Sequence, residues 1–178
     1  YTMLGGMWSV GYTDVVQFAL IPIGLFVALP FALSSVGGLE ACWSNYVAAQ
    51  SDRAWVLPPA TPSEYWTAPR IVGWWDLSIM LMLGGIPWNC YFQRGQACQT
   101  ARKAQWQSVV AGAITIVMTI PPLLLGMAAF GFRGWSAAAE AQVNDAPTRA
   151  LPLLLAQAVP GAVAVIGLTA IVGAVTSS

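Results

Sequence analysis

Charge and histidine are both scarce in this sequence. Its 178 residues include no histidine, and only 8% of them are Asp, Glu, Lys or Arg, whereas a soluble domain carries about a quarter charged residues. The formal net charge is zero, and no basic patch or acidic run stands out. The composition therefore argues against a soluble domain, a nucleic-acid-binding surface and an acidic solvating tail.

Cysteines are also few. Cys42, Cys90 and Cys98 lie in different segments, and their spacing matches no metal-ligand pattern. We therefore expect neither a disulfide framework nor a transition-metal site. We expect no bound cofactor and no enzyme activity either.

Apolar residues, by contrast, are abundant. They make up 57% of the chain, and they gather in four stretches close to the roughly 20 residues that cross about 30 Å of hydrocarbon. We therefore predict an all-α integral membrane protein with four transmembrane helices. The predicted spans are residues 15–33, 74–92, 108–130 and 160–178.

Both ends of the chain suggest cuts through a longer protein. The sequence opens on Tyr1 with no charged region ahead of an apolar one, so it shows no signal peptide. It closes on Ser178 inside an apolar helical pattern that has no capping signal after it. We therefore expect an internal fragment, whose partners include the lipid bilayer and the remaining helices of the full-length protein.

The positions of the cations predict the orientation of the spans. Cytoplasmic loops are enriched in Lys and Arg, and the short segment after the second span holds three cations and no acid. We therefore place the loop 94–106 inside, and the loops 34–73 and 131–150 outside. Three tryptophans near the end of the first outer loop suit an aromatic belt at headgroup depth; they are Trp66, Trp74 and Trp75.

The second span is interrupted in its middle by Gly84-Gly85-Ile86-Pro87. An unwound stretch inside the membrane is tolerated only where it is buried in protein or lines a watery cavity, and transporters place binding sites there. Trp88 follows the break and Tyr91 lies one turn further on. An aromatic face at that place suits a quaternary ammonium ion, which cation–π attraction can hold. The alternative is a packing kink, with aromatic residues that face the core or lipid.

Ala174, Ser177 and Ser178 share one face of the fourth span. A backbone carbonyl and two hydroxyls offer oxygen ligands to a hard cation such as sodium, although hydroxyl side chains also bridge helices in membranes. Asp14 and Asp76 are the acids at the margins of the spans. Each is a candidate for an ion pathway or, alternatively, a helix cap, and the Thr13-Asp14 pair is a good helix start.

Three stretches of the sequence are distinctive when they are taken together. They are Gly-Gly-Met-Trp-Ser-Val-Gly-Tyr-Thr-Asp-Val-Val-Gln at residues 5–17, Leu-Met-Leu-Gly-Gly-Ile-Pro-Trp at residues 81–88 with Tyr-Phe-Gln-Arg at 91–94, and Ala-Val-Thr-Ser-Ser at 174–178. Together they resemble the sodium/solute symporter family and, within it, the branch of high-affinity choline transporters. The second stretch is the most specific to the choline branch, while the first also marks the wider family.

The resemblance implies a leucine-transporter-like fold of inverted repeats, of which this chain would hold core helices five to eight. It implies uptake of choline with sodium by alternating access, at the plasma membrane, with chloride as a possible additional ion. It assigns Trp88 to the aromatic cage around choline, beside Tyr91 and the Gly84-Gly85 break. It assigns Ala174, Ser177 and Ser178 to sodium and Asp14 to the inner ion path, and Asp76 matches an acid in the same helix.

Three alternatives stay open, of which one takes the chain as a subunit in its own right. The cargo could be another small organic solute, such as betaine, proline or a sugar, carried by the same kind of symporter. A sensor or channel built on the same helices is the third alternative.

Overall fold

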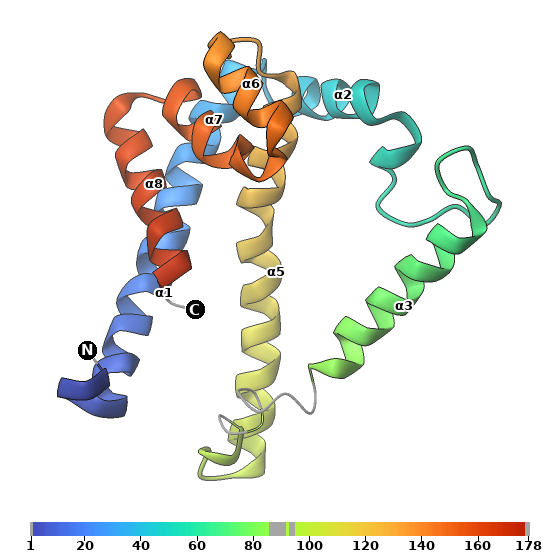
Figure 1. Cartoon of the computed structure of the whole chain (residues 1–178). Coiled ribbons are helices and arrows are strands. Elements are labelled where there is room, and N and C mark those ends of the chain that lie inside the picture. The colour runs from blue at the N-terminus through green and yellow to red at the C-terminus, as the bar shows by residue number, and fades with distance from the viewer. Residues whose placement is uncertain (1, 86–91, 93–94, 177–178) are drawn as a thin grey trace. The chain divides into compact units, whose positions relative to one another are not determined.

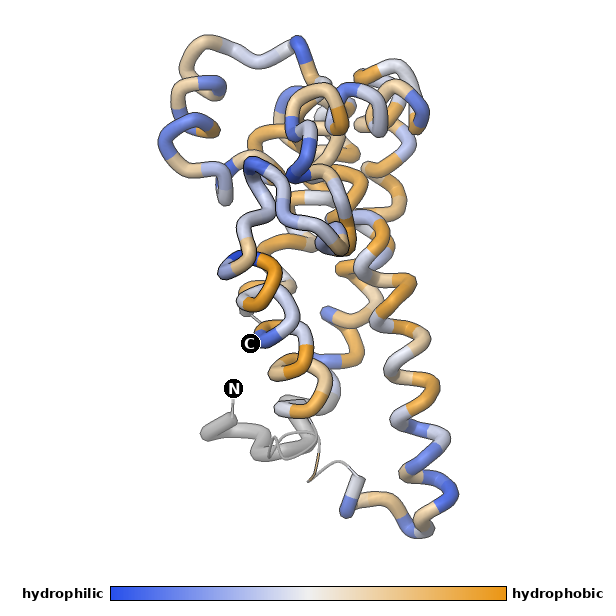
Figure 2. The backbone as a smooth tube through the Cα atoms, turned by 90° about the vertical axis from the view of Figure 1, so that its right-hand side faces the viewer, coloured by the Kyte–Doolittle hydropathy of each residue, from blue (hydrophilic) through white to orange (hydrophobic). Residues whose placement is uncertain are grey.

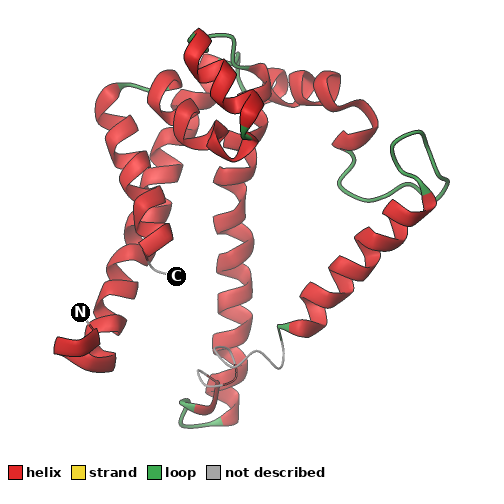
Figure 3. Ribbon diagram, viewed as in Figure 1, coloured by secondary structure: helices red, strands yellow, loops and turns green. Residues whose placement is uncertain are grey.

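The computed structural model describes residues 2–85, 92 and 95–176 (Figure 1). Within this part of the chain all regular structure is helical and no strand occurs, as Figure 3 shows by colour. The prediction of an all-α protein is therefore confirmed for these residues. The helices are α1 (Thr2–Ser35), α2 (Leu39–Gln50), η1 (Ser51–Ala54), α3 (Ala68–Gly84), α5 (Ala101–Gly131), α6 (Ala137–Asp145), η2 (Pro147–Arg149), α7 (Ala150–Ala158) and α8 (Gly161–Thr176).

The chain forms two compact units. The first contains residues 1–49 and 118–178, and the second contains residues 50–117. α5 passes from one unit to the other, so its early residues belong to the second unit and its later ones to the first. Each unit is described below by itself.

Within the first unit, α1 and α8 pack against each other through small residues (Figure 1). Gly24 and Ala28, one turn apart on α1, are buried, as are Gly167 and Ala170 on α8. A Cβ atom placed on Gly24 would lie 2.5 Å from the Cβ of Ala170 and 2.9 Å from the carbonyl oxygen of Ile166. Small residues thus allow the two backbones to approach closely, which is how helices associate in lipid, where the hydrophobic effect gives little drive.

A cluster of larger side chains completes the core of this unit. Leu125 of α5 and both Leu154 and Leu155 of α7 are fully buried, and they join Ala28 of α1 and Cys42 of α2. The Cys42 thiol donates a weak hydrogen bond to the Leu124 carbonyl, with 3.8 Å between sulfur and oxygen. Because burial raises the pKa of the Cys42 thiol, this side chain stays protonated near neutral pH.

α1 ends at a pair of glycines. Gly37 and Gly38 have φ angles of 94° and 96°, which glycine adopts without the steric cost that a Cβ brings. The Gly38 amide donates to the Leu33 carbonyl at 2.8 Å, and the Gly37 amide donates to the Ser34 carbonyl at 3.3 Å. These two bonds form a Schellman cap, after which α2 begins at once.

The segments expected as outer loops contain helices. α2 and η1 lie within residues 34–73, and α6 lies within residues 131–150. α3 also begins at Ala68, before the predicted start of the span at residue 74. The reason is Pro69, which occupies the first turn of α3, where its missing amide hydrogen has no partner to lose.

The helix that contains the predicted first span begins earlier than the expected start at Thr13-Asp14. α1 runs from Thr2 without interruption, through Pro22 and Pro30 as well, so the Thr13-Asp14 pair lies inside the helix and not at its start.

Trp66, predicted in an aromatic belt, is only 7% exposed. Its indole N–H instead donates to the Asp52 carbonyl at 2.8 Å, which removes the reason for this ring to sit at a wet interface.

Two described helices are long and apolar enough to cross a membrane. They are the segment Asp14–Ser35 of α1 and the whole of α5, by length and composition. Figure 2 shows hydrophobic residues along the long helices and hydrophilic residues concentrated toward the connecting segments. The apolar part of α8, Gly161–Val175, is shorter, and α3 has 17 residues. The second and fourth spans therefore stay predictions.

Candidate functional site

Two of the residues predicted to bind the substrate, Gly84 and Gly85, lie at the carboxyl end of α3 in the second unit. α3 ends at Gly84, and Gly85 follows with φ −68° and ψ −26°. The helix thus ends at the first residue of the predicted break. Trp88 and Tyr91, which are predicted to form an aromatic face here, lie outside the described residues.

Close packing within the described residues does not explain either glycine. A Cβ atom on Gly84 would meet nothing within 4 Å, and one on Gly85 would meet only the Leu81 carbonyl oxygen, at 3.7 Å. Met82 and Leu83 beside them are 65% and 60% exposed. This end of α3 therefore has open space beside it, which a ligand, lipid or a further helix can fill.

The carboxyl end of a helix is also suited to a cation. The last four carbonyl groups of a helix lack intrahelical partners, and they carry the negative end of the helix dipole. At the end of α3 these are the carbonyls of residues 81–84, of which the Leu83 carbonyl accepts a hydrogen bond from the Gly85 amide. A cation without hydrogen-bond donors is attracted to such carbonyls by charge alone.

Asp76 lies in the middle of α3 and is exposed. Because α3 begins at Ala68, a capping role for this carboxylate is excluded. Among the residues that the structure describes, Asp76 takes part in no ion pair. Trp74 and Trp75 precede it, with their rings at 85° to each other and 4.9 Å between centroids. Within the described part of the chain, Asp76 is thus an unpaired charge next to aromatic residues.

Of the residues predicted to handle sodium, Asp14 lies on α1 and Ala174 on α8 of the first unit. Ala174 is half-buried and lies one turn beyond Ala170, whose Cβ is beside Gly24 of α1. Ser177 and Ser178 lie outside the described residues. The structure therefore describes one of the three predicted ligands, on the helix that packs against α1.

Asp14 lies on α1 and is half-exposed. α1 and α8 are antiparallel, because Gly24 lies beside Ala170 while Ala28 lies beside Gly167. At about 1.5 Å per residue, Asp14 is therefore roughly 9 Å further along the shared axis than Ala174. That separation is too long for both residues to ligate one cation.

Sequence reasoning did not single out Gln17, which lies one turn from Asp14 on α1. Its side-chain oxygen Oε1 is fully buried. A buried amide within an apolar segment costs free energy unless it is hydrogen-bonded. The available signal was a single amide among the apolar residues that follow Asp14.

Comparisons with known proteins point in one direction. The sequence model of the sodium:solute symporter family matches residues 1–178. The chain is 36% identical to high-affinity choline transporter 1 of Drosophila melanogaster and 36% identical to high affinity choline transporter 1 of Homo sapiens. Both alignments cover 100% of this chain, and they cover 27% and 30% of those proteins. The chain therefore spans less than a third of the length of these relatives.

A second kind of relative matches over a shorter stretch. The sodium/glucose cotransporter 1 of Mus musculus is 43% identical over 49 residues, which cover 28% of this chain and 7% of that protein. No solved structure matches the chain.

Proposed function

The chain belongs to the sodium:solute symporter family, and we propose that it forms part of a longer transporter that takes up choline together with sodium. One observation carries the choice of choline. Similarity to choline transporters extends over 100% of the chain, whereas similarity to a glucose cotransporter extends over 28% of it. The chain spans about 30% of the choline transporters it matches, so uptake requires the helices of the complete transporter.

The choline half of the proposal is centred on the carboxyl end of α3. Choline offers no N–H donor, so its recognition depends on cation–π attraction and on carbonyl dipoles. We propose that Gly84 and Gly85 leave room for choline to approach this end of α3. Trp88 and Tyr91 then supply aromatic faces of the cage.

The sodium half of the proposal is centred on the end of α8. The carbonyl of Ala174 and the hydroxyls of Ser177 and Ser178 are proposed as three oxygen ligands, with the others supplied by helices outside this chain. Asp14 takes a position on the path between this site and the cytoplasm. Asp76 draws cations toward an outer vestibule. Chloride is proposed as a possible additional ion, and replacement of chloride by gluconate in an uptake assay tests it.

The proposed topology has four spans in a multi-pass plasma-membrane protein, within a leucine-transporter-like fold of inverted repeats. The cytoplasmic position of residues 94–106 is supported by Arg102 and Lys103 in the first turns of α5, which have no acid beside them. Residues 34–73 and 131–150 then face outside. The length of α5 and the small-residue contact of α1 with α8 are both what spans in a helical bundle require.

Uptake of labelled solutes by the complete transporter tests this proposal. Choline is expected to enter cells in a sodium-dependent manner, and betaine, proline and glucose to enter at the rate of untransfected cells. Equal uptake of all four solutes, or no uptake of choline, would overturn the choice of substrate. Choline currents that persist without sodium would instead indicate a channel.

A further inference from the structure

The segment between η1 and α3 in the second unit is tied into a defined turn. The Trp66 indole donates to the Asp52 carbonyl at 2.8 Å, and the Trp66 amide donates to the Ser63 hydroxyl at 3.1 Å. The Ser63 amide in turn donates to the Trp66 carbonyl at 3.0 Å. With Trp66 buried and bonded in this way, the neighbouring Tyr65 is held in a fixed position.

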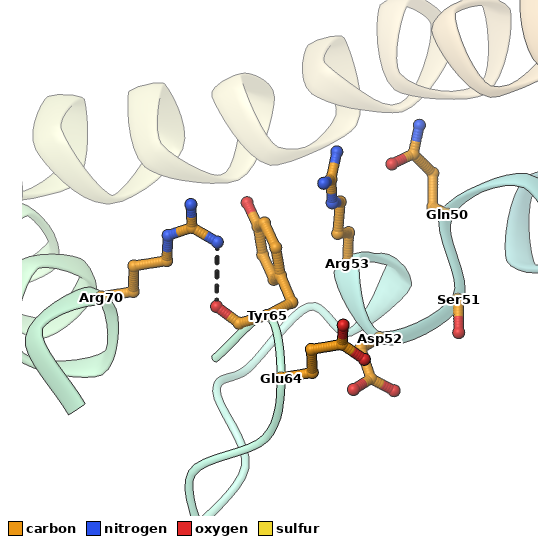
Figure 4. Close-up of a pocket in the computed structure, with 7 residues that line it drawn as sticks. All are labelled: Gln50, Ser51, Asp52, Arg53, Glu64, Tyr65 and Arg70. Carbon is orange, nitrogen blue, oxygen red and sulfur yellow. Dashed lines mark hydrogen bonds between the residues drawn. The ribbon is translucent and has the colours of Figure 1, made fainter. Parts of the chain in front are cut away.

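Two arginines lie against the ring of Tyr65. The Cζ atoms of Arg53 and Arg70 are 4.7 Å and 4.4 Å from the ring centroid, and Figure 4 shows them on opposite faces of the ring. Arg70 Nη1 also donates to the Tyr65 carbonyl at 3.0 Å. Cation–π contacts use the flat faces of the guanidinium groups, so the N–H groups along their edges remain available to a ligand.

These groups line a pocket of about 290 Å³. In Figure 4 the guanidinium groups of Arg53 and Arg70, the Tyr65 hydroxyl and the Gln50 amide all point to the same side. Ser51, between Gln50 and η1, has a φ angle of 47°, which is uncommon for a residue other than glycine. Such strain often occurs at binding sites, and here it allows Gln50 and Arg53 to line one pocket.

A row of donors of this kind suits a phosphate group. A carboxylate has two oxygens and pairs best with a single guanidinium, whereas a phosphate ester offers more oxygens and can contact both arginines. Neither Arg53 nor Arg70 forms an ion pair with a residue that the structure describes. Both charges are therefore available to a ligand.

The formal charges of the residues that line the pocket cancel, which restricts the class of ligand that it fits. Asp52 and Glu64 line the same pocket as Arg53 and Arg70, so the formal charges of the lining sum to zero. In Figure 4 the two carboxylates lie below the guanidinium groups. A zwitterion with an anionic and a cationic end matches this division of charge better than a ligand that is anionic throughout.

The position of the pocket beside the exposed tryptophans of α3 indicates where such a zwitterion comes from. Arg70 and Trp74 lie one turn apart on α3, and Trp75 beside them is 48% exposed. Exposed tryptophans at the end of a membrane helix sit at the level of lipid headgroups, where phospholipid phosphates also lie. This step rests on the proposed membrane topology, whereas the pocket itself does not.

We propose that Gln50, Arg53, Tyr65 and Arg70 bind the phosphate of a zwitterionic phosphate ester, with Asp52 and Glu64 facing its cationic end. The ligand is either the headgroup of a phospholipid or a soluble ester of the same chemistry. This site is separate in sequence from the residues proposed for choline and sodium. It would secure the turn before α3 at the membrane surface.

Binding to the complete transporter tests the proposal. The probes are phosphocholine, dihexanoylphosphatidylcholine and dihexanoylphosphatidylglycerol, each titrated into purified protein without sodium or choline. We expect the Arg53→Gln/Arg70→Gln double variant to bind the choline-containing probes at least about tenfold more weakly, since it loses the charge-assisted hydrogen bonds. Arg133→Gln, which removes a cation outside the pocket, is the control and should change binding less than about twofold.

The three probes separate the sources. Binding of phosphocholine that the double variant weakens supports a soluble ester, and binding of the short-chain phosphatidylcholine alone supports a lipid headgroup. The proposal would be overturned if neither phosphocholine nor the short-chain phosphatidylcholine binds, or if the double variant binds them as tightly as the parent protein. Tighter binding of phosphatidylglycerol than of phosphatidylcholine to the parent protein would overturn it as well. Because transport is not the readout, failure of choline uptake leaves this test unaffected.

Two milder variants keep the test decisive if the double variant fails to fold. Tyr65→Phe retains the ring between the arginines and loses one hydroxyl, so we expect about threefold weaker binding. Asp52→Asn/Glu64→Gln makes the lining positive, so the preference should move toward phosphatidylglycerol. An unchanged affinity in the first variant together with an unchanged preference in the second would contradict the proposed site.

Discussion

α1 and α8 use their surfaces in a different way from α3. On α1 and α8, small residues such as Gly24 and Ala170 are buried where the two helices meet. α3 has no buried residue along its whole length of 17. α1 and α8 thus find packing partners in each other, while α3 leaves its surface open to further partners such as lipid, ligand or another helix. A transporter needs both kinds of helix, because rigid packing must hold a site that solute can enter.

Replacement of Gly24 by leucine should have the largest effect on this contrast. The new side chain would overlap Ala170 and the Ile166 backbone, and overpacking against backbone costs about 3 kcal/mol. The thermal stability of the complete transporter in detergent measures it. Gly73→Ala on α3, where an added Cβ meets nothing within 4 Å, is the matched control and should shift stability by less than about 1 kcal/mol. Similar losses in the two variants would remove the contrast between these helices.

Replacement of Trp88 by alanine should come next, because it tests whether the end of α3 meets ligand. Loss of a desolvated cation–π face costs about 1–2 kcal/mol, so half-saturation should need roughly 5- to 30-fold more choline. The sodium dependence should change little. Trp75→Ala, an exposed tryptophan on the same helix, serves as control. If choline affinity is the same in both variants and in the parent, Trp88 faces packing or lipid.

Removal of both hydroxyls in Ser177→Ala/Ser178→Ala tests the corresponding claim for α8. We expect the sodium concentration for half-maximal uptake to rise several-fold, since two neutral oxygen ligands are lost. Thr169→Ala on the same helix is the control, because its hydroxyl already bonds the Val165 carbonyl at 2.7 Å. A sodium curve that the double variant leaves unaltered would return these serines to helix packing.

The smallest expected effect concerns the two described cysteines. Cys42 is buried, and burial raises the pKa of its thiol, so at pH 7 it should react with maleimides far more slowly than Cys98. An impermeant maleimide should label Cys98 only from the cytoplasmic side. Labelling of Cys98 from outside would reverse the proposed orientation, and rapid labelling of Cys42 would contradict its position in the core.

The sequence predicted those features that depend on local chemistry. Long apolar runs identified α1 and α5, and the Gly84-Gly85 pair identified the end of α3. Pro69 was misinterpreted as part of a loop because proline breaks helices in their interior but favours their first turn. The short helices α2 and α6 were missed because they are brief and only weakly amphipathic, so no periodic pattern announced them.

Tertiary contacts were less accessible to sequence reasoning. The spacing of Gly24 and Ala28 is compatible with a small-residue interface, yet only the structure shows that α8 is the helix that meets it. The stacking of Arg53 and Arg70 on Tyr65 likewise brings together residues that lie apart in the sequence. Such pairings follow from packing, which a single sequence does not specify.

Sodium-driven accumulation in proteoliposomes shows whether the complete transporter couples choline entry to sodium. The complete transporter is reconstituted, and labelled choline is followed with an inward sodium gradient and then with equal sodium on both sides. We expect internal choline to rise above the external concentration under the sodium gradient. With equal sodium on both sides, choline should only equilibrate. Accumulation that ignores the sodium gradient, or the absence of any choline entry, would contradict sodium-coupled choline uptake.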